Sequence, residues 1–320
     1  MRSIGRRKTP HPNPLPQGER GPVADNAEVI LRPSPRRIRA GVAWALLLLA
    51  VLFSVVVRWR LREFPLERDE GEFAYAGQLI LENVPPYQLA YNMKLPGTYL
   101  AYAALMAVLG QTTAGIHLGL LAVNVATLVL LFLMVSDMFD PLTGGLAAVA
   151  LSLLAMSSSV LGMAAHATHF VVLFSLPGVW LLWKAVQSGK RGPLLAAGLL
   201  MGIAFLMKQQ GVFLLCFGGC VLMAYELRRR PIVWRQLLSR AALYAAGVMM
   251  PYGLVCLWLW RAGVFGRFWF WTVAYARQYV DQIPLSLAWQ AFRMNAAGVI
   301  APSWTLWALA AVGGIVVAIG

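Results

Sequence analysis

The chain has 320 residues, of which 59% are hydrophobic and only 12% are charged, and its mean hydropathy is +0.66. Soluble domains carry about 25% charged residues, so this composition excludes a soluble protein and predicts an all-α, polytopic integral membrane protein. The net charge of +14 does not indicate nucleic-acid binding, because nine of the 27 basic residues precede position 40 and others flank apolar runs, as the positive-inside rule expects.

Residues 1–38 are rich in Pro, Arg and Gly and show no apolar periodicity, which is typical of a disordered extension. The stretch TPHPNPLPQGERG resembles a repeat that is often translated by mistake upstream of bacterial genes, so we assign it no function. The first apolar run begins too far along the chain for a signal peptide. We predict a membrane module over 39–320, and because no polar tail follows its last apolar run, we expect a C-terminally truncated chain.

Eight apolar runs have about the length of a membrane-spanning helix, which needs roughly 20 residues. They are predicted at 41–59, 116–136, 142–160, 170–187, 192–207, 211–226, 241–260 and 299–320. The basic segment RRIRA precedes the first run, so the positive-inside rule places the N-terminus in the cytoplasm and the residues after the first span outside.

The apolar segment GTYLAYAALMAVLG, residues 97–110, is too short to span comfortably. If it crossed the membrane, the arginine-rich loop 226–240 would face outward. If it lies in the interface, this loop and the basic turn 188–193 both face the cytoplasm, which the positive-inside rule favours. We therefore predict a juxtamembrane or re-entrant helix here. The outer face then collects residues 60–115, 162–170, 208–211 and 261–298.

Six of the thirteen carboxylates fall between positions 63 and 82, directly after the first span. The segment RDEGEF is typical of a helix start, with Asp69 as N-cap and a Glu at the third helical position closing back on it. A carboxylate at a membrane interface can also be the general base for an acceptor hydroxyl or amine. Capping and catalysis can coexist on neighbouring residues.

Two lysines lie at predicted boundaries between membrane and water. Lys94 precedes Leu95-Pro96-Gly97, which ends one helix and begins the next. Lys208, in FLMKQQG, lies at an outer helix end, against the positive-inside pattern. Each lysine can simply extend its ammonium to the interface, or it can neutralise a phosphate. Gln209 and Gln210 can hydrogen-bond a sugar.

The segment HATH places His166 and His169 at i, i+3. Such a spacing can ligate a metal, but two histidines without a nearby carboxylate are too few. A hydrogen-bonding or proton-transfer role and simple interfacial packing are the other interpretations. The three cysteines are scattered through apolar runs and match no metal spacing. We predict neither a metal nor a cofactor.

The segment RFWFWTVAYARQYVDQ, residues 267–282, is rich in aromatic residues that suit the membrane interface. Arg277 and Asp281 are spaced i, i+4, as in a helix ion pair. The segment is either a membrane anchor or a lid over a lipid-linked donor. The sequence has no Walker loop, dinucleotide-binding fingerprint or nucleophile elbow, which argues against a nucleotide-dependent reaction.

Four motifs together resemble one family: DEGEFAYAGQLIL, PPY, KLPGTYLAY and LMKQQG. They are similar to the bacterial dolichyl-phosphate-mannose-protein mannosyltransferase-like family, which includes the lipid A aminoarabinose transferases and belongs to the GT-C membrane glycosyltransferases. The resemblance covers about residues 41–260. It implies a GT-C helical module with juxtamembrane helices in its first outer loop. It also implies sugar transfer from a polyprenyl-phosphate donor to an acceptor at the outer face of the bacterial cytoplasmic (inner) membrane.

The resemblance also implies roles for particular residues. Asp69 matches the catalytic Asp of the first outer loop, Glu70 matches the acid that follows it, and Lys94 matches the lysine that holds the donor phosphate. The substrate-binding candidates are Lys94, Tyr75, His166, His169, Lys208 and Gln209. A single displacement with Asp69 as base predicts inversion at the anomeric carbon.

Two positions depart from the family pattern. The aminoarabinose transferases have a Glu before the lysine, where this chain has Met93. The second outer loop often reads Ala-Thr-Asp, where this chain has His169 after Ala-Thr. Both changes remove an acid, which disfavours a bound metal and leaves the acceptor open as lipid, protein or glycan.

A transporter or flippase is the alternative function from another class. It would need polar residues within its spans and repeated halves. Asn124 is one polar residue well inside a predicted span, and we find no internal repeat. A non-catalytic assembly subunit is a further alternative.

Overall fold

The computed structural model describes residues 35–319 except residue 283. These residues form helices, turns and loops without a strand, which confirms the predicted all-α class. The chain divides after residue 38, and residues 39–320 form one compact unit. The predicted disordered extension lies outside the described residues up to position 34.

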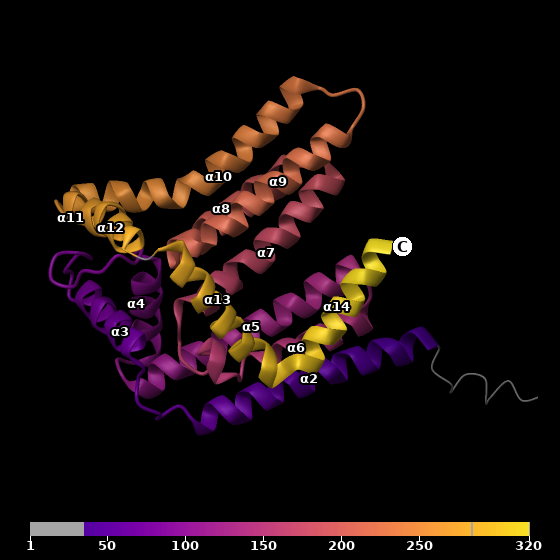
Figure 1. The fold of residues 1–320 in the computed structure, drawn as a ribbon, viewed down its shortest axis with the longest axis horizontal. Helices are drawn as coiled ribbons and strands as arrows, with labels where there is room; N and C mark the ends of the chain where they lie inside the picture. Colours follow the sequence, from indigo (N-terminus) through magenta and orange to yellow (C-terminus); the bar gives the residue numbers. More distant parts are fainter. Residues whose placement is uncertain (1–34, 283, 320) are drawn as a thin grey trace, which may run out of the picture. The chain divides into compact units, whose positions relative to one another are not determined.

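Before the last helix, ten longer helices make up most of this unit in the part of the chain that the structure describes (Figure 1). They are α2 (Pro35–Arg60), α3 (Arg68–Leu81), α4 (Gly97–Leu109), α5 (Thr113–Met138), α6 (Pro141–Leu154), α7 (Ala167–Ser188), α8 (Arg191–Met207), α9 (Val212–Arg228), α10 (Trp234–Arg261) and α13 (Leu285–Ile300). The helix α14 (Trp304–Ile319) follows α13 after a 3₁₀ turn. Between α10 and α13 lie α11 (Phe265–Trp269), a π-helical turn (Phe270–Tyr275) and α12 (Ala276–Asp281).

Within the described residues, six helical segments are long and apolar enough to cross a membrane, which confirms a polytopic protein. They are 38–60, 113–138, 167–188, 209–228, 234–261 and 286–319. Two of the eight predicted spans fall on shorter apolar helices, α6 with 14 residues and α8 with 17. The last apolar segment begins at 286 rather than 299, so α13 occupies part of the predicted outer loop 261–298.

Helix α6 ends at Leu154, earlier than the predicted limit at 160, and the reason lies in the residues that follow. Serine side chains compete for backbone hydrogen bonds and favour turns, and Ser157 to Ser159 form the start of the loop that leads to α7. The buried Arg58 holds this loop, donating hydrogen bonds to the carbonyl oxygens of Ala155 at 3.1 Å and Gly162 at 2.8 Å.

Helices α3 and α4 pack closely against each other. Helix α4 has 13 residues, which corresponds to about 20 Å at 1.5 Å per residue and suits the predicted juxtamembrane helix. Its close approach depends on Gly77, because a Cβ there would lie 3.0 Å from the Ala103 amide nitrogen and 2.6 Å from the Met106 methyl carbon. Phe73 and Tyr102 fill the interface, with ring centroids 5.4 Å apart.

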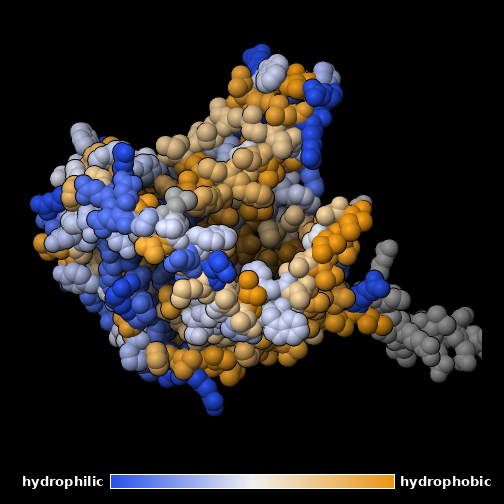
Figure 2. Space-filling model, in the orientation of Figure 1, coloured by the Kyte–Doolittle hydropathy of each residue, from blue (hydrophilic) through white to orange (hydrophobic). Residues whose placement is uncertain are grey.

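The connections between helices gather at two opposite ends of the unit (Figure 1). One end carries α3, α4, α11, α12 and the α8–α9 turn. The other carries the α7–α8 turn and the α9–α10 loop, which contain the basic segments 188–193 and 226–240. Figure 2 shows hydrophilic residues over the end with α3 and apolar residues along the helices between the ends. This separation agrees with the predicted arrangement of loops.

Candidate functional site

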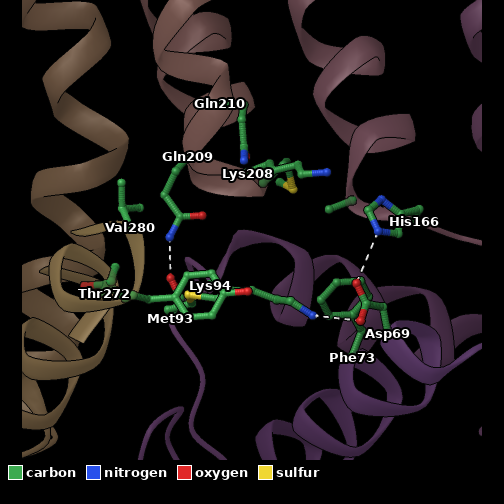
Figure 3. Close-up of a pocket in the computed structure, with 14 residues that line it drawn as sticks. Asp69, Phe73, Met93, Lys94, His166, Lys208, Gln209, Gln210, Thr272 and Val280 are labelled. Carbon is green, nitrogen blue, oxygen red and sulfur yellow. Dashed lines mark hydrogen bonds and ion pairs between the residues drawn. The ribbon is translucent and has the colours of Figure 1, made fainter. Parts of the chain in front are cut away.

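A cavity of about 450 Å³ lies at the end of the unit that carries α3 (Figure 3). Its walls come from α3, the loop before α4, the start of α7, the α8–α9 turn and the segment from the π-helical turn to α12. The lining residues are Asp69, Phe73, Met93, Lys94, His166, Ala167, Met207, Lys208, Gln209, Gln210, Thr272, Ala276, Tyr279 and Val280. Five of the predicted site residues, Asp69, Lys94, His166, Lys208 and Gln209, are therefore brought together here.

The start of α3 leaves the Asp69 carboxylate free for this cavity. Our prediction that Asp69 caps the helix is wrong, because the N-cap is Glu67. Its side chain accepts a hydrogen bond from the Asp69 amide at 2.7 Å, and Glu70 closes the capping box by accepting from the Glu67 amide at 2.8 Å. Glu67 and Glu70 thus provide the capping groups, and no backbone amide occupies the oxygens of Asp69.

Asp69 makes three charged or polar contacts. Its Oδ1 lies 3.3 Å from Lys94 Nζ and 3.1 Å from the exposed Arg68, and its Oδ2 lies 3.2 Å from His166 Nε2. Partial burial favours the neutral acid, but Lys94, Arg68 and His166 together hold the pKa of Asp69 below its ordinary value. Asp69 is therefore a carboxylate at neutral pH, as a general base must be.

Lys94 is held in place along its whole length. Its ammonium lies 2.8 Å from Glu72 Oε2 and 4.5 Å from the centre of the Phe73 ring. Its carbonyl oxygen accepts a hydrogen bond from Tyr87 at 2.7 Å. Three residues further on, Gly97 lies against the backbone of Leu206, where a Cβ would collide. The lysine is thus fixed by its neighbours on both sides rather than extended freely into solvent.

Glu70 lies beneath the site and does not line the cavity. Its Oε1 accepts a hydrogen bond from the Ala165 amide and lies 3.2 Å from His117 Nε2. Burial favours the neutral acid, but hydrogen bonds from His117, Ala165 and Glu67 hold the pKa of Glu70 below its ordinary value. Glu70 therefore ties the loop before α7 to α3, and this contact brings the next residue of the loop, His166, to Asp69.

Partial burial in the cavity wall lowers the pKa values of both His166 and Lys208. Burial, together with the nearby Lys208 ammonium, holds the pKa of His166 below its ordinary value, and the hydrogen bond to Asp69 offsets this only in part. Burial also lowers the pKa of Lys208. His166 is accordingly neutral at neutral pH and donates its Nε2 proton to Asp69. In Figure 3 the Lys94 and Lys208 side chains both extend toward the side of the cavity with Asp69.

Two hydrogen bonds join the end of α8 and the α8–α9 turn to the loop that carries Lys94 and to the start of α4. Gln209 donates its side-chain amide to the carbonyl oxygen of Met93 (Figure 3), and Thr98 donates its hydroxyl to the carbonyl oxygen of Met207 at 2.7 Å. These contacts link residues more than 100 positions apart. They bring Lys208 into the same cavity as Lys94.

Two predicted substrate-binding residues do not line the cavity. The side chain of Tyr75 is exposed, with 52% of its surface accessible, and it projects elsewhere from α3. His169 is instead partly buried and lines a separate cavity of about 180 Å³ between α2, α5, α6 and α7, together with Asn124 and Thr168. The i, i+3 spacing of His166 and His169 spans the start of α7, so the two imidazoles face different surroundings.

The aromatic segment 267–282 contributes one wall through Thr272, Ala276, Tyr279 and Val280. Arg277 and Asp281 form the expected i, i+4 pair at 3.9 Å, on the exposed side. A membrane anchor and a lid over the donor are still the two interpretations of the segment 267–282. Among residues 35–319 that the structure describes, no three His, Cys, Asp or Glu side chains are grouped to hold a metal.

Sequence reasoning missed Glu72, although it carries the closest contact to Lys94. Its carboxylate also accepts hydrogen bonds from Asn92 at 2.8 Å and Tyr99 at 3.1 Å. Asp69 and Glu72 are spaced i, i+3, and on a helix this spacing places two side chains on one face. That periodicity was the available signal, and it could have placed Glu72 beside Asp69.

This helical membrane protein has a carboxylate and two lysines around one cavity. Comparison of its sequence with known families places it in the class of membrane glycosyltransferases. Residues 93–258, just over half of the chain, match the dolichyl-phosphate-mannose-protein mannosyltransferase family. The chain belongs to this family, as the motifs predicted. No curated protein and no solved structure matches the chain.

Proposed function

We propose that this protein transfers a sugar from a polyprenyl-phosphate donor to an acceptor hydroxyl or amine at the outer face of the bacterial inner membrane. The observation that carries the proposal is the pair of Asp69 and Lys94, 3.3 Å apart in a cavity that also contains Lys208. A carboxylate suits the role of base, and the ammonium groups suit that of phosphate ligands. The cavity of about 450 Å³ lies within the usual range of about 300–1,000 Å³ for small-molecule sites.

The reaction we infer is a single displacement. The acceptor oxygen or nitrogen attacks the anomeric carbon while the bond from that carbon to the phosphate oxygen breaks, and its electron pair leaves with the phosphate. The acceptor proton passes to Asp69. Lys94 and Lys208 stabilise the negative charge that develops on the leaving phosphate. Attack from the side opposite the leaving group inverts the anomeric configuration.

His166 has a supporting role in this scheme. A neutral imidazole that donates to Asp69 at 3.2 Å directs one carboxylate oxygen and leaves the other near Lys94. The amides of Gln209 and Gln210 and the hydroxyl of Thr272 line the cavity and offer hydrogen bonds for sugar hydroxyls. The polar loops at the α3 end, opposite the basic segments 188–193 and 226–240, support an outward-facing site.

The test is transfer by the purified full-length protein in detergent, supplied with radiolabelled polyprenyl-phosphate sugars and candidate lipid, peptide and glycan acceptors. We expect acceptor-dependent release of label with inverted configuration, reduced by about 10²–10⁴ in Asp69→Asn while donor binding persists. Asp137→Asn, at the opposite end of the unit, is the matched control and keeps full activity.

Three results would count against the proposal. Equal turnover in Asp69→Asn and the unaltered protein would remove Asp69 as base. A product that keeps the configuration of the donor would exclude a single displacement. Donor binding with movement across the bilayer but without transfer would favour the flippase alternative.

A further inference from the structure

The ammonium group of Lys94 contacts two carboxylates at the cavity. Lys94 Nζ lies 2.8 Å from Glu72 Oε2 and 3.3 Å from Asp69 Oδ1. Both acids come from α3, three residues apart, and Lys94 approaches them from the loop before α4. The shorter contact is to Glu72, which does not line the cavity, whereas Asp69 and Lys94 both do.

Glu72 is itself held by two further donors. Asn92 Nδ2 donates to Oε2 at 2.8 Å, and the hydroxyl of Tyr99, a buried side chain, donates to Oε1 at 3.1 Å. The side-chain oxygen of Asn92, Oδ1, also accepts a hydrogen bond from the backbone amide of Met93 at 2.7 Å. This bond fixes the orientation of the Asn92 side-chain amide. A carboxylate with donors on both oxygens cannot turn away from Lys94 without losing them. Asp69 also has donors on both oxygens, but it lines the cavity and its contact with Lys94 is the longer one at 3.3 Å. A ligand in the cavity therefore reaches Asp69 rather than Glu72, which makes Glu72 the fixed partner of the lysine and Asp69 the exchangeable one.

We propose that Glu72 is a positioning residue that retains the Lys94 ammonium in the site while a donor phosphate displaces Asp69 from it. This inference rests on the proposed function and deepens it. While Lys94 contacts both acids, it partly neutralises the carboxylate of Asp69. When the phosphate binds, the ammonium keeps its bond to Glu72 and exchanges Asp69 for a phosphate oxygen, so that the base becomes free only when the donor is present.

The hydrogen-bonding capacity of Lys94 suits this exchange. An ammonium has three N–H donors, and among the residues described two are directed at Glu72 and Asp69. The third can take up a phosphate oxygen at the cavity side first, and the contact with Asp69 is then given up as the phosphate charge replaces it. The Phe73 ring, 4.5 Å from Nζ, supports the ammonium in this position and limits how far it can move.

The proton affinity of Asp69 depends on the charged and titratable groups around it. They are Arg68 and Glu72 on α3, Lys94 on the following loop, Tyr99 and Tyr102 on α4, His166 before α7 and Lys208 after α8. Glu72 is the one carboxylate in this set, and it draws part of the Lys94 charge away from Asp69. Without that carboxylate, Lys94 would pair with Asp69 alone, and Asp69 would become a weaker base.

The decisive variant is Glu72→Gln, because the amide keeps the shape and the hydrogen bonds. Its oxygen can accept from Lys94 and Asn92, and its NH₂ can donate to the Tyr99 oxygen. We expect kcat to fall about tenfold, which corresponds to about one pKa unit of lost basicity. The acid limb of the kcat–pH profile moves to lower pH. Binding of farnesyl phosphate, measured by titration in detergent, stays within about threefold or tightens, because one negative charge has left the site.

Two further variants separate positioning from structural support. Glu72→Asp keeps the charge and restores most of the lost kcat, and Glu82→Gln, at the exposed end of the same helix, changes neither quantity. The proposal is overturned if kcat and its pH profile are unchanged in Glu72→Gln. It is also overturned if farnesyl phosphate binding weakens in step with kcat, as a purely structural role predicts.

The failure of the proposed function would look different from the failure of this inference. An unaltered protein that does not bind farnesyl phosphate, or binds it without Lys94 dependence, would remove the donor-phosphate site and this inference with it. Phosphate binding that requires Lys94, combined with a Glu72→Gln variant identical to the unaltered protein, would overturn only the role of Glu72.

Discussion

Two ion pairs at opposite ends of the helices show what separates a structural charge from a functional one. At the end away from the cavity, Arg240 pairs with Glu226 at 2.8 Å, and their side chains are only 4% and 5% exposed. Arg240 also donates to the carbonyl oxygens of Gly189 at 2.9 Å and Ala185 at 3.0 Å. This arginine closes the α7–α8 turn onto α10 and has a protein partner on each side.

The Asp69–Lys94 pair is arranged differently. Its side chains are 14% and 26% exposed, its distance is 3.3 Å, and its lysine is shared with Glu72 beside an open cavity. A pair that is enclosed by protein on all sides stabilises the fold in one state. A pair that is longer, shared and next to a cavity can exchange a partner for a ligand, and this is what identifies the site.

The comparison predicts its largest effect at the enclosed pair. Glu226→Ala leaves Arg240 buried without its carboxylate, which should lower the free energy of unfolding by about 3–5 kcal/mol. Transfer activity per folded molecule should be unchanged, because the pair is far from the cavity. Thermal unfolding in detergent measures the loss of stability. Turnover by the folded fraction measures the transfer activity. Glu226→Gln retains an acceptor for Arg240 and should lose less stability than Glu226→Ala. If either variant lost more activity than its unfolded fraction explains, the purely structural role of this pair would be contradicted.

The shared pair should respond in the opposite way. Lys94→Ala removes the ammonium that we propose as the ligand of the leaving phosphate, so transfer should fall about 10²–10³-fold, as when one charge-stabilising donor is removed from an active site. The free energy of unfolding should change by only about 1 kcal/mol, since the pair is partly solvated. Lys184→Ala, which removes the exposed Asp137 pair, serves as the control. A Lys94→Ala variant that is strongly destabilised yet active would reverse our interpretation of the two ends.

The smallest predicted effect is a pH dependence from His166. Its pKa is below its ordinary value in the folded protein, so between the two values the unfolded chain binds more protons than the folded one. Stability from this group is therefore fully present above about pH 6.5 and is lost as the pH falls through the folded pKa. Asp69, whose pKa is also held low, acts in the same direction at more acidic pH. Unfolding midpoints from pH 8 to 5 should fall less in His166→Gln than in the unaltered protein, and an equal fall in both would place the titrating group elsewhere.

Local patterns in the sequence accounted for much of this architecture. Long apolar runs predict membrane helices because each backbone group must be satisfied inside the bilayer, and six such segments are present. The cluster of acids after the first span and the lysine before Leu-Pro-Gly predicted a polar site at one end. Asp69, Lys94, His166, Lys208 and Gln209 do lie around one cavity.

Other features depended on which of several equivalent residues the fold selected. The acids at 67, 69, 70 and 72 look alike in sequence, but only the structure distinguishes the cap residues Glu67 and Glu70 from Asp69 at the cavity and Glu72 behind Lys94. In the same way, His166 lines this cavity while His169 lines a different one, and Tyr75 is exposed and lines neither. Each of these outcomes rests on a direction that a side chain takes within a single helical turn.

By itself, the sequence determined the family, the helical class and the end of the molecule where the chemistry gathers, because these follow from composition, apolar periodicity and local motifs. Only the tertiary structure decided which acid meets which cation. The deciding contacts join distant parts of the chain, such as Glu70 to the Ala165 amide across 95 positions and Gln209 to Met93 across 116. No local pattern encodes such a pairing, because it arises from the packing of whole helices against one another.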